Sequence, residues 1–296
     1  MIPGTVTGAG GAMELRRFHS IEEFYGRVEP FLLAREAEHN LLLGICAHLM
    51  RYPERVERPP YLACVEQEGQ VVAAAFMGPP NNLVLSHIAA PGAIPLIASD
   101  LYGEYKTLPG VVAPVPFSKA FAEEWQRQSG QSHELRMAER LYQLEKVNAV
   151  TDVPGGMRKA TERDTALLCR WMAEFHAEAL GETDTSHTGL MVDRFLHSET
   201  QGIYLWEDGH GLPVSMSGYS RPTPNGIVIL AVYTPREHRG RGYASANVAA
   251  LSRLLLDQGR KYCFLYTDLA NPTSNHIYQA IGYKPVSDAD MYRFGT

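Results

Sequence analysis

The sequence lacks the long apolar runs and the charge excess that mark membrane proteins and nucleic-acid binders. No stretch reaches the roughly 18 consecutive apolar residues that a membrane-spanning helix needs. The 27 basic side chains face 33 acidic ones, and the net charge of −6 makes the chain a poor general binder of nucleic-acid phosphates. We therefore expect neither a membrane nor a nucleic acid among its partners.

Cysteine is scarce, and Cys46, Cys64, Cys169 and Cys263 form no CxxC pair. Each lies in or beside an apolar stretch, which predicts reduced thiols rather than disulfides. The histidines form no HExxH motif and no cluster with cysteine, so we expect no metal site. Residues 1–12 lack the basic and apolar segments of a secretory signal. Together these features predict a cytoplasmic protein.

Two parts of the sequence repeat one order of predicted elements. Residues 61–88 and residues 202–234 each predict a strand, a tight turn, a strand, a proline-containing loop and a strand. A mostly helical segment precedes each part, over residues 21–50 and 160–196. Similarity at half the chain length predicts a duplicated domain rather than a solenoid.

Turn-forming residues between 148 and 156 predict the junction of the two domains. Residues 133–147 and 289–294 each predict a closing strand. Helices alternate with strands and hairpins, which predicts the α/β class, with a mixed central sheet flanked by helices in each domain. We expect the following division: a flexible lead over 1–12, a first domain over 13–147, a linker over 148–156 and a second domain over 157–296.

The most informative segment spans residues 227–259. A strand of β-branched and apolar residues is stopped by Pro235, and a glycine-rich turn with the sequence RGRGYA follows at residues 239–244. An amphipathic helix begins there. A strand, a glycine-rich turn and a helix point backbone N–H groups and the positive end of the helix dipole at an anion.

Other anion-binding motifs do not explain this turn. The GxxxxGK[ST] pattern of a P-loop is absent, and no GxGxxG follows a strand. A basic surface loop or a short RNA-binding Arg-Gly tract is the alternative. Such a tract is normally repeated in a polar, disordered setting, whereas this one joins an apolar strand to an amphipathic helix.

A second informative segment spans residues 261–286, which predict a strand, a loop, a short helix and a strand. Pro272 is suited to the first helical position, and Gly282 to the position after the last. Asn271 and Tyr278 are seven residues apart, or two helical turns if both belong to the helix, so they could face one cleft.

These two segments carry a resemblance to a known family. RGRGYA resembles the [RQ]xxGx[GA] motif of the GNAT (GCN5-related N-acetyltransferase) superfamily. NPTSNHIYQAIGY, over residues 271–283, resembles that family's Asn…Ser…Tyr helix. The detailed resemblance covers residues 157–296, whereas residues 13–147 share only the layout. The resemblance therefore implies two GNAT-like domains in tandem, the first of them degenerate.

The resemblance also implies roles for particular residues, with acetyl-CoA as the acyl donor. Tyr278 would be the general acid for the departing thiolate. Asn271 would hydrogen-bond the pantetheine arm, and Ser274 belongs to the same cofactor-binding motif. The remaining implied contacts are backbone groups of Val232, Tyr233 and Thr234 along the arm, and Arg239, Gly240, Arg241, Gly242, Tyr243 and Ala244 around the pyrophosphate.

The general base is less evident. An alkylamine is mostly protonated at pH 7, so a base should remove a proton before the amine attacks. The strand Ile227–Tyr233, where many family members place a carboxylate, has none. The helix-loop region that shapes the acceptor side offers a set of candidates, each with an ordinary solvated surface as the alternative: Glu174, His176, Glu182, Asp184 and His187.

The first domain departs from the motif. Residues 87–105 lack the arginine and the paired small residues, and Pro91 and Pro95 remove backbone donors. The corresponding late helix, residues 117–128, has no Asn…Tyr pair. We expect a domain that does not bind CoA in the usual way.

The leading hypothesis is an acetyl-CoA-dependent N-acetyltransferase in which a primary amine attacks the thioester directly. The acceptor would be a small-molecule or peptide amine. A catalytically inactive acyl-CoA-binding sensor or interaction protein is the alternative, and a nucleic-acid module using Arg236, Arg239 and Arg241 is a third, less favoured by the charge. A homodimer stays open as an assembly.

Overall fold

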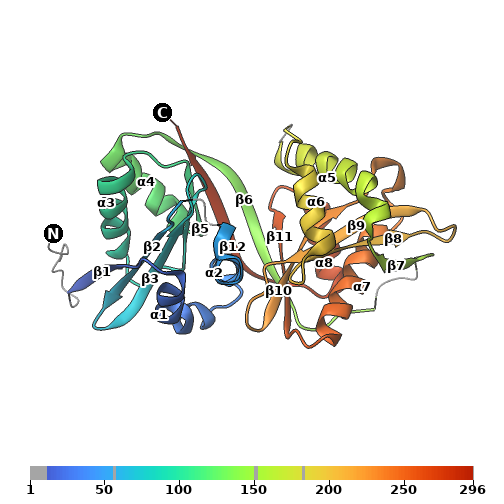
Figure 1. Cartoon of the computed structure of the whole chain (residues 1–296), viewed down its shortest axis with the longest axis horizontal. Coiled ribbons are helices and arrows are strands. Elements are labelled where there is room, and N and C mark those ends of the chain that lie inside the picture. The colour runs from blue at the N-terminus through green and yellow to red at the C-terminus, as the bar shows by residue number, and fades with distance from the viewer. Residues whose placement is uncertain (1–11, 56–57, 150–152, 182–183, 296) are drawn as a thin grey trace. The chain divides into compact units, whose positions relative to one another are not determined.

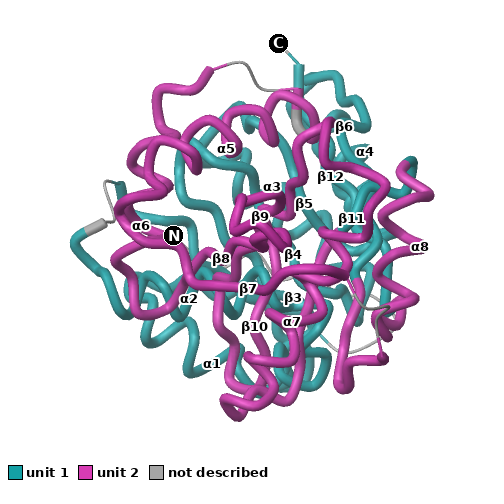
Figure 2. The backbone as a smooth tube through the Cα atoms, turned by 90° about the vertical axis from the view of Figure 1, so that its right-hand side faces the viewer, with its two compact units in different colours: residues 1–141, 267–270, 286–296 teal, residues 142–266, 271–285 magenta. Residues whose placement is uncertain are grey.

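The computed structural model describes residues 12–55, 58–149, 153–181 and 184–295. It divides into two compact units, which Figure 2 shows in different colours. Unit 1 comprises residues 1–141, 267–270 and 286–296, and unit 2 comprises residues 142–266 and 271–285. The expected N-terminal lead, apart from residue 12, and residues 150–152 of the expected linker lie outside the described residues.

The first half of the chain forms an ordered series of helices and strands (Figure 1). In chain order they are β1 (Met13–Arg17), α1 (Ile21–Leu33), α2 (Asn40–Arg51), the short 3-10 helix η1 (Pro53–Arg55), β2 (Tyr61–Gln67), β3 (Gln70–Met77), β4 (Leu83–Leu85), α3 (Ala93–Tyr105), β5 (Gly110–Pro114), α4 (Phe117–Ser129) and β6 (His133–Leu144).

The second half repeats that series. Its elements are β7 (Gly156–Lys159), the 3-10 helix η2 (Glu162–Asp164), α5 (Thr165–Leu180), α6 (Thr188–His197), β8 (Gly202–Glu207), β9 (Pro213–Ser220), β10 (Gly226–Tyr233), the 3-10 helix η3 (Arg236–His238), α7 (Tyr243–Asp257), β11 (Tyr262–Asp268), α8 (Pro272–Ile281) and β12 (Lys284–Phe294). Apart from the 3-10 turns, each half contains a strand, two helices, three strands, a helix, a strand, a helix and a strand, which confirms the predicted duplication.

The predicted hairpins are confirmed, and the predicted helical segments are interrupted. Glu68 and Gly69, with φ of 52° and 74°, turn the chain between β2 and β3, as the left-handed region requires in a tight hairpin turn. The segment 21–50 is not one helix, because residues 34–39 form turns that separate α1 from α2. The segment 160–196 is likewise divided between α5 and α6.

Unit 1 is a mixed sheet covered on both faces. Its strands lie in the order β1-β2-β3-β4-β5-β12-β6, with β4 and β5 parallel. Alternate residues of β2 point to opposite faces, as strand geometry dictates. Tyr61 and Ala63 pack with α3 and α4, whereas Leu62 and Cys64 pack with α1 and α2 (Figure 1). The predicted α/β architecture is therefore confirmed in this unit.

Unit 2 has the same layered build. Its strands lie in the order β11-β10-β9-β8-β7, with β10 and β11 parallel and the other pairs antiparallel. Helices α7 and α8 cover one face, in a core that contains Ile227 and Ile229. Helices α5 and α6 cover the other face, in a core that contains Ala231 and Tyr233.

The closing strands do not divide between the units as the sequence order suggests. Residues 286–294 of β12 belong to unit 1, where Asp290 pairs with Ala113 and Met291 with Val112 of β5. Conversely, the last residues of β6 belong to unit 2, where Tyr142 and Leu144 enter the core. The chain thus returns to unit 1 at its end, whereas we expected residues 157–296 to form one continuous domain.

A further sequence prediction concerns the cysteines. Cys46, Cys64 and Cys263 are buried free thiols, as predicted, and Cys169 is a half-buried one. Burial raises the pKa of the Cys46, Cys64 and Cys263 thiols to about 12. Within the described ranges, none of the helices is both long and apolar enough to span a bilayer.

Candidate functional site

The parallel strands β10 and β11 separate before they end. Their described pairing runs from Gly226 and Tyr262 to Val228 and Phe264, whereas β10 continues to Tyr233. Backbone groups along this edge of β10 are therefore available to a partner other than β11. The separation is the splay that the resemblance implies for the strand before the loop.

A β-bulge reshapes the end of β10. The pairing with β9 shifts register between Leu230 and Tyr233, and Ala231 has a φ of 51°, which is uncommon for a residue with a side chain. Beyond the bulge, Val232 packs against the core beneath α7 and α8. Tyr233 packs against the core beneath α5. The bulge therefore shifts the alternation along β10: Ile229 before it and Val232 after it face the core beneath α7, whereas Ala231 and Tyr233 face the core beneath α5.

The glycine-rich turn leaves the first backbone amides of α7 without a cap. Gly240 and Gly242 have φ of 74° and 81°, and Gly242 is the N-cap residue. In the described part of the chain no side chain caps these amides, and the first turn carries no acidic residue. Uncapped N–H groups at the positive end of a helix dipole suit a phosphate group.

Small residues keep this turn open. A Cβ atom on Gly242 would lie 3.0 Å from Cγ2 of Val153, whereas one on Gly240 would meet no heavy atom within 4 Å. Tyr243 contributes its backbone at the first helical position, since its own side chain is buried with Trp206 and Val214. The turn thus exposes its backbone at Gly240 and Gly242, while the ring of Tyr243 lies in the core.

The two arginines of the motif lie in different surroundings. Arg239 donates from Nε to the carbonyl of Thr234 over 2.8 Å, and its guanidinium forms an ion pair with Glu178 of α5. Glu178 raises the pKa of Arg239, and Arg239 lowers that of Glu178. Arg241 is exposed, and its guanidinium makes no hydrogen bond within the described ranges.

Helix α8 begins as predicted, with Pro272 in its first turn and Gly282 after its end. Asn271 is the N-cap rather than a helical residue, and its side-chain oxygen accepts a hydrogen bond from the Ser274 amide over 3.1 Å. This bond assigns Asn271 and Ser274 a structural task that leaves the Asn271 side-chain NH₂ for other contacts.

Tyr278 lies on α8 beside the core of unit 2. Its ring contacts that of Tyr283 edge to face, with centroids 6.0 Å apart. Its hydroxyl makes no hydrogen bond to another described residue, and desolvation raises its pKa to about 12. Such a phenol keeps its proton at neutral pH and has it free to donate. Tyr278 and Val232 both pack against one core cluster, from α8 and from β10.

A residue that sequence reasoning missed supports α8 from below. Tyr142, fully buried at the end of β6, donates its hydroxyl proton to Asn275 over 2.9 Å and accepts from Gln279 over 3.0 Å. It therefore ties two turns of α8 to a strand more than a hundred residues earlier. Only the aromatic residue within an apolar strand could have signalled it, and that signal is common to core positions.

Among the candidate bases, the structure brings Glu174 to the end of β10. Its Oε2 accepts the hydroxyl proton of Tyr233 over 3.0 Å. Burial, and after it this hydrogen bond, raises the pKa of Tyr233 to about 12. Asp184 instead pairs with the exposed His187, and His176 packs on Phe175. Glu182 lies outside the described residues.

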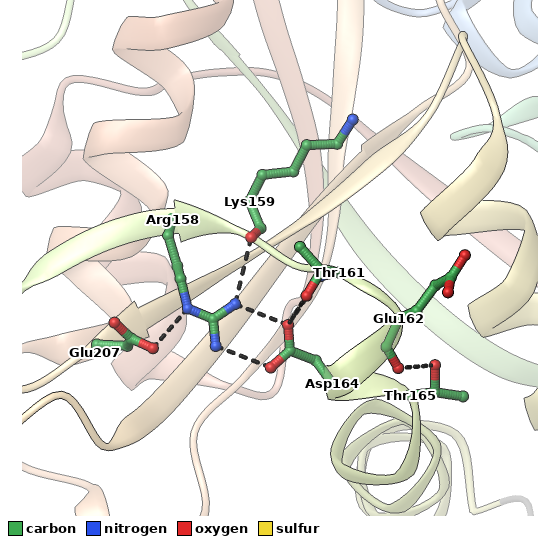
Figure 3. Close-up of polar contacts among 7 residues, drawn as sticks. All are labelled: Arg158, Lys159, Thr161, Glu162, Asp164, Thr165 and Glu207. Atoms are coloured by element: carbon green, nitrogen blue, oxygen red, sulfur yellow. Dashed lines mark hydrogen bonds and ion pairs between the residues drawn. The ribbon is translucent and has the colours of Figure 1, made fainter.

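A polar corner fixes the start of α5 (Figure 3). Arg158 donates to both carboxylate oxygens of Asp164, over 2.7 and 2.8 Å, and to Glu207 over 2.5 Å. Asp164 also accepts from the amide of Thr161 over 2.8 Å, closing a capping box. Arg158 lowers the pKa of Asp164 to about 2. The corner sets the direction in which α5 carries Glu174 and Glu178.

Known proteins share this sequence pattern and this fold. The sequence model of the FR47-like protein family matches residues 220–292, which contain both motifs. No curated protein sequence matches the chain significantly. Among solved structures, a Drosophila protein covers 95% of this chain and 98% of its own, at 12% identity and a TM-score of 0.65.

Two further solved structures match over nearly the whole chain. A GCN5-related N-acetyltransferase from Sphaerobacter thermophilus covers 96% of this chain and 97% of its own, at 14% identity and a TM-score of 0.61. A tandem GNAT protein from the clavulanic acid biosynthesis pathway covers 95% and 97%, at 14% identity and a TM-score of 0.57. The chain has the GNAT fold. The match extends over both units, so the fold confirms the resemblance carried by the two motifs.

Unit 1 is GNAT-like in fold but differs at the positions that matter in unit 2. Helix α3 also begins after a glycine N-cap, Gly92, but its φ is −62° and the residue before it is Pro91 rather than an arginine. At the start of α4, Phe117 packs edge-on against His87 with ring centroids 4.9 Å apart. The N-cap of this helix is Pro116, which has no polar side chain, whereas the N-cap of the corresponding helix α8 is Asn271.

The described residues of the GNAT fold group no three histidine, cysteine or carboxylate side chains in a way that could hold a metal ion. The polar groups gathered in unit 2 are backbone amides, arginines, phenols and two α5 carboxylates. Their chemistry is that of anion binding and proton transfer.

Proposed function

We propose that the protein is an acetyl-CoA-dependent N-acetyltransferase that acts on a primary amine. The observation that carries the proposal is the combination of the splayed edge of β10 with the uncapped start of α7. An extended donor with a pyrophosphate needs both a free strand edge and converging N–H groups. The GNAT fold itself supports the proposal more broadly, since acetyltransferases are among the structures that share it.

The residues of unit 2 suit such a donor. Backbone groups of Val232, Tyr233 and Thr234 would follow the arm, and Gly240 through Ala244 would supply amides to the pyrophosphate. The carbonyl of Tyr233 already accepts from Ser215 over 3.2 Å, and that of Thr234 accepts from Arg239. Their contribution to the arm would therefore come from N–H groups or second lone pairs. The bound donor supplies an activated acetyl group.

Tyr278 would act as the general acid. Its raised pKa, to about 12, keeps the phenol protonated, and its proton is committed to no described residue. Protonating a departing sulfur prevents the reverse attack and contributes to rate when the acid is well placed. Asn271, at the start of the same helix, would hold the donor in line with Tyr278.

Glu174 would act as the general base. It would take the proton that the acceptor ammonium loses, so that the nitrogen lone pair can form the new C–N bond. The C–S bond would break as the C–N bond forms, and Tyr278 would supply a proton to the sulfur. The second proton lost by the nitrogen would restore the Tyr278 hydroxyl. The hydrogen bond from Tyr233 holds Glu174 by one oxygen and leaves the other for the amine. Glu174 would thus serve as the base that β10, which carries no carboxylate, does not provide.

The proposed acceptor is a small-molecule or peptide amine, and the net charge of −6 favours a cationic one through long-range attraction. Unit 1 is proposed not to bind CoA in the usual way, because Pro91 and Pro116 stand where unit 2 has Arg241 and Asn271. A cytoplasmic location and a homodimer remain part of the same proposal.

One assay tests the proposal and separates it from an inactive acyl-CoA sensor. Release of free thiol from acetyl-CoA would be followed with a panel of primary amines, alongside calorimetric binding of acetyl-CoA. Binding with amine-dependent thiol release supports the enzyme. Binding without release for any amine favours the sensor, and no binding by folded protein rejects both.

A further inference from the structure

Arg239 is fully engaged within unit 2, although the motif places it among the anion-binding residues. Its Nη1 and Nη2 lie 2.8 and 2.9 Å from the two carboxylate oxygens of Glu178. Its Nε donates to the carbonyl of Thr234 over 2.8 Å. The guanidinium also lies 5.7 Å from the ring centroid of Tyr233. These contacts join the glycine-rich turn to β10 and to α5.

The ion pair uses the side of the guanidinium that a phosphate would need. Arginine recognises carboxylates and phosphates through the same two-pronged geometry. A phosphate could bind both Nη atoms of Arg239 only by displacing the Glu178 carboxylate. The displaced carboxylate would then lie beside the phosphate and repel it. Arg241, two residues further on, is exposed and carries no such partner among the described residues.

The second carboxylate of α5 strengthens the connection. Glu174 lies one helical turn before Glu178, and residues four apart share a helix face. Glu174 holds Tyr233, the last residue of β10, and Glu178 holds Arg239, the first residue of the motif. Two side chains on one face of α5 thus contact β10 and the glycine-rich turn that follows β10.

We propose that Arg239 and Glu178 are positioning residues. Their ion pair fixes the turn so that the amides at the start of α7 converge, and Arg241 supplies the side-chain charge that meets the anion. This inference rests on the proposed function, because it assigns how the same site binds its donor. Arg239 would therefore hold the anion-binding turn in place and would not contact the anion itself.

The test is calorimetric binding of CoA to the full chain and to Glu178→Gln, Arg239→Gln and the double variant. Each single change should weaken binding by about two- to fivefold, the range of a partly exposed ion pair. The double variant should bind about as well as Arg239→Gln, because that single variant already loses both the shared ion pair and the bond to the Thr234 carbonyl. The charge exchange Glu178→Arg with Arg239→Glu should recover most of the loss.

Glu237→Gln is the matched control. Glu237 is an exposed carboxylate in η3, close in sequence to the turn. Loss of a negative charge near an anion site should by itself strengthen CoA binding or leave it unchanged. If Glu178→Gln binds CoA more weakly, the cause is therefore the lost ion pair with Arg239 and not the removal of a negative charge near the anion.

A second measurement tests the mechanism without CoA. Hydrogen exchange of the amides at residues 239–246 should quicken in Glu178→Gln, because the turn loses its tie to α5. A direct phosphate contact would leave this exchange unchanged. Arg241→Gln should weaken CoA binding while leaving the exchange as in the unsubstituted chain.

The outcomes separate this inference from the proposed function. The inference is overturned if the unsubstituted chain binds CoA, Arg239→Gln loses about tenfold or more, and Glu178→Gln binds as well or better. It is equally overturned if the charge exchange abolishes binding while the protein melts normally. Absence of CoA binding by the unsubstituted, folded chain rejects the proposed function instead.

Discussion

The hydroxyl of Tyr233 and the Oε2 atom of Glu174 lie 3.0 Å apart, although the two residues are 59 positions apart in the sequence. Tyr233 ends β10 and Glu174 lies in the middle of α5. The contact brings a carboxylate to the strand end, whereas the strand itself carries none. It is the structural basis for assigning the base.

Replacing Glu174 by Gln should lower turnover with an alkylamine at pH 7 by about a hundredfold, because the ammonium keeps its proton. Hydroxylamine, which is neutral at this pH, should be acetylated by the variant nearly as well as by the unsubstituted chain. Thiol release measures both rates. Glu123→Gln, an exposed carboxylate on α4 of unit 1, serves as the control. An equal loss with both amines would assign Glu174 a structural role.

Replacing Tyr278 by Phe should lower turnover by about tenfold or more while leaving the dissociation constant of acetyl-CoA nearly unchanged. The phenyl ring keeps the contact with Tyr283, so the fold should not suffer. Single-turnover thiol release and calorimetry together give the two quantities. Unchanged turnover would mean that water or another group protonates the sulfur.

The sequence predicted the local parts of this site well. The glycines at 240 and 242 and the helix start at Pro272 follow from short-range rules of backbone geometry. Those rules need no knowledge of distant neighbours, since φ values and missing N–H groups are properties of single residues. The turn between β10 and α7 and the limits of α8 were therefore predictable.

The parts that the sequence did not predict are contacts between distant segments. The contacts of the α5 carboxylates with Tyr233 and Arg239 could not be predicted. Helical periodicity shows that these carboxylates lie on a polar face, but it does not show which residues they contact. The return of β12 to β5 has the same cause. Residues 289–294 alternate as a strand does, and that pattern fits several strand edges equally. The pairing with β5 is determined by how the side chains pack in the folded core.

Replacing Arg158 by Met should lower the free energy of unfolding by about 1–3 kcal/mol, because Asp164 is left nearly buried with its strongest partner gone. Thermal melting should show a fall of several degrees. Arg163→Met, in the same 3-10 turn, is the control and should melt close to the unsubstituted chain. Equal melting of both variants would show that the corner does not stabilise α5.

The same corner should be sensitive to strong acid. The folded-state pKa of Asp164 is about 2, below its ordinary value of 3.8. Its ionised form is therefore favoured by folding, and the stabilisation is present above pH 3.8 and lost as the pH falls toward 2. Arg158→Met should flatten the melting temperature between pH 4 and pH 2. An unchanged acid slope would contradict the assignment.

His39 should make unit 1 less stable at mildly acidic pH. Its Nδ1 donates to the carbonyl of Leu32 over 2.9 Å, and its Nε2 accepts from the amide of His87 over 3.0 Å. Desolvation lowers its pKa from 6.5 to about 4, so folding favours the neutral ring. Stability should fall as the pH drops from 6.5 to 4, by up to about 3 kcal/mol.

The variant His39→Gln isolates this effect, because it removes the titrating ring. Urea unfolding at pH 7, 6 and 5 should give a smaller loss of stability in the variant than in the unsubstituted chain. His87, whose pKa burial also lowers, stays in place in both proteins and contributes equally. A loss of the same size in both would mean that His39 does not titrate with unfolding.

The donor site at the start of α7 is tested by calorimetric binding of acetyl-CoA to the unsubstituted chain, Gly242→Val and Gly211→Val. Both glycines have a positive φ, of 81° and 78°, so both substitutions strain the backbone, but Gly211 lies in the β8–β9 hairpin turn. We expect micromolar binding that falls at least about tenfold in Gly242→Val and persists in Gly211→Val. Folded protein that binds no acetyl-CoA, or Gly242→Val that binds it as tightly as the unsubstituted chain, would contradict the account.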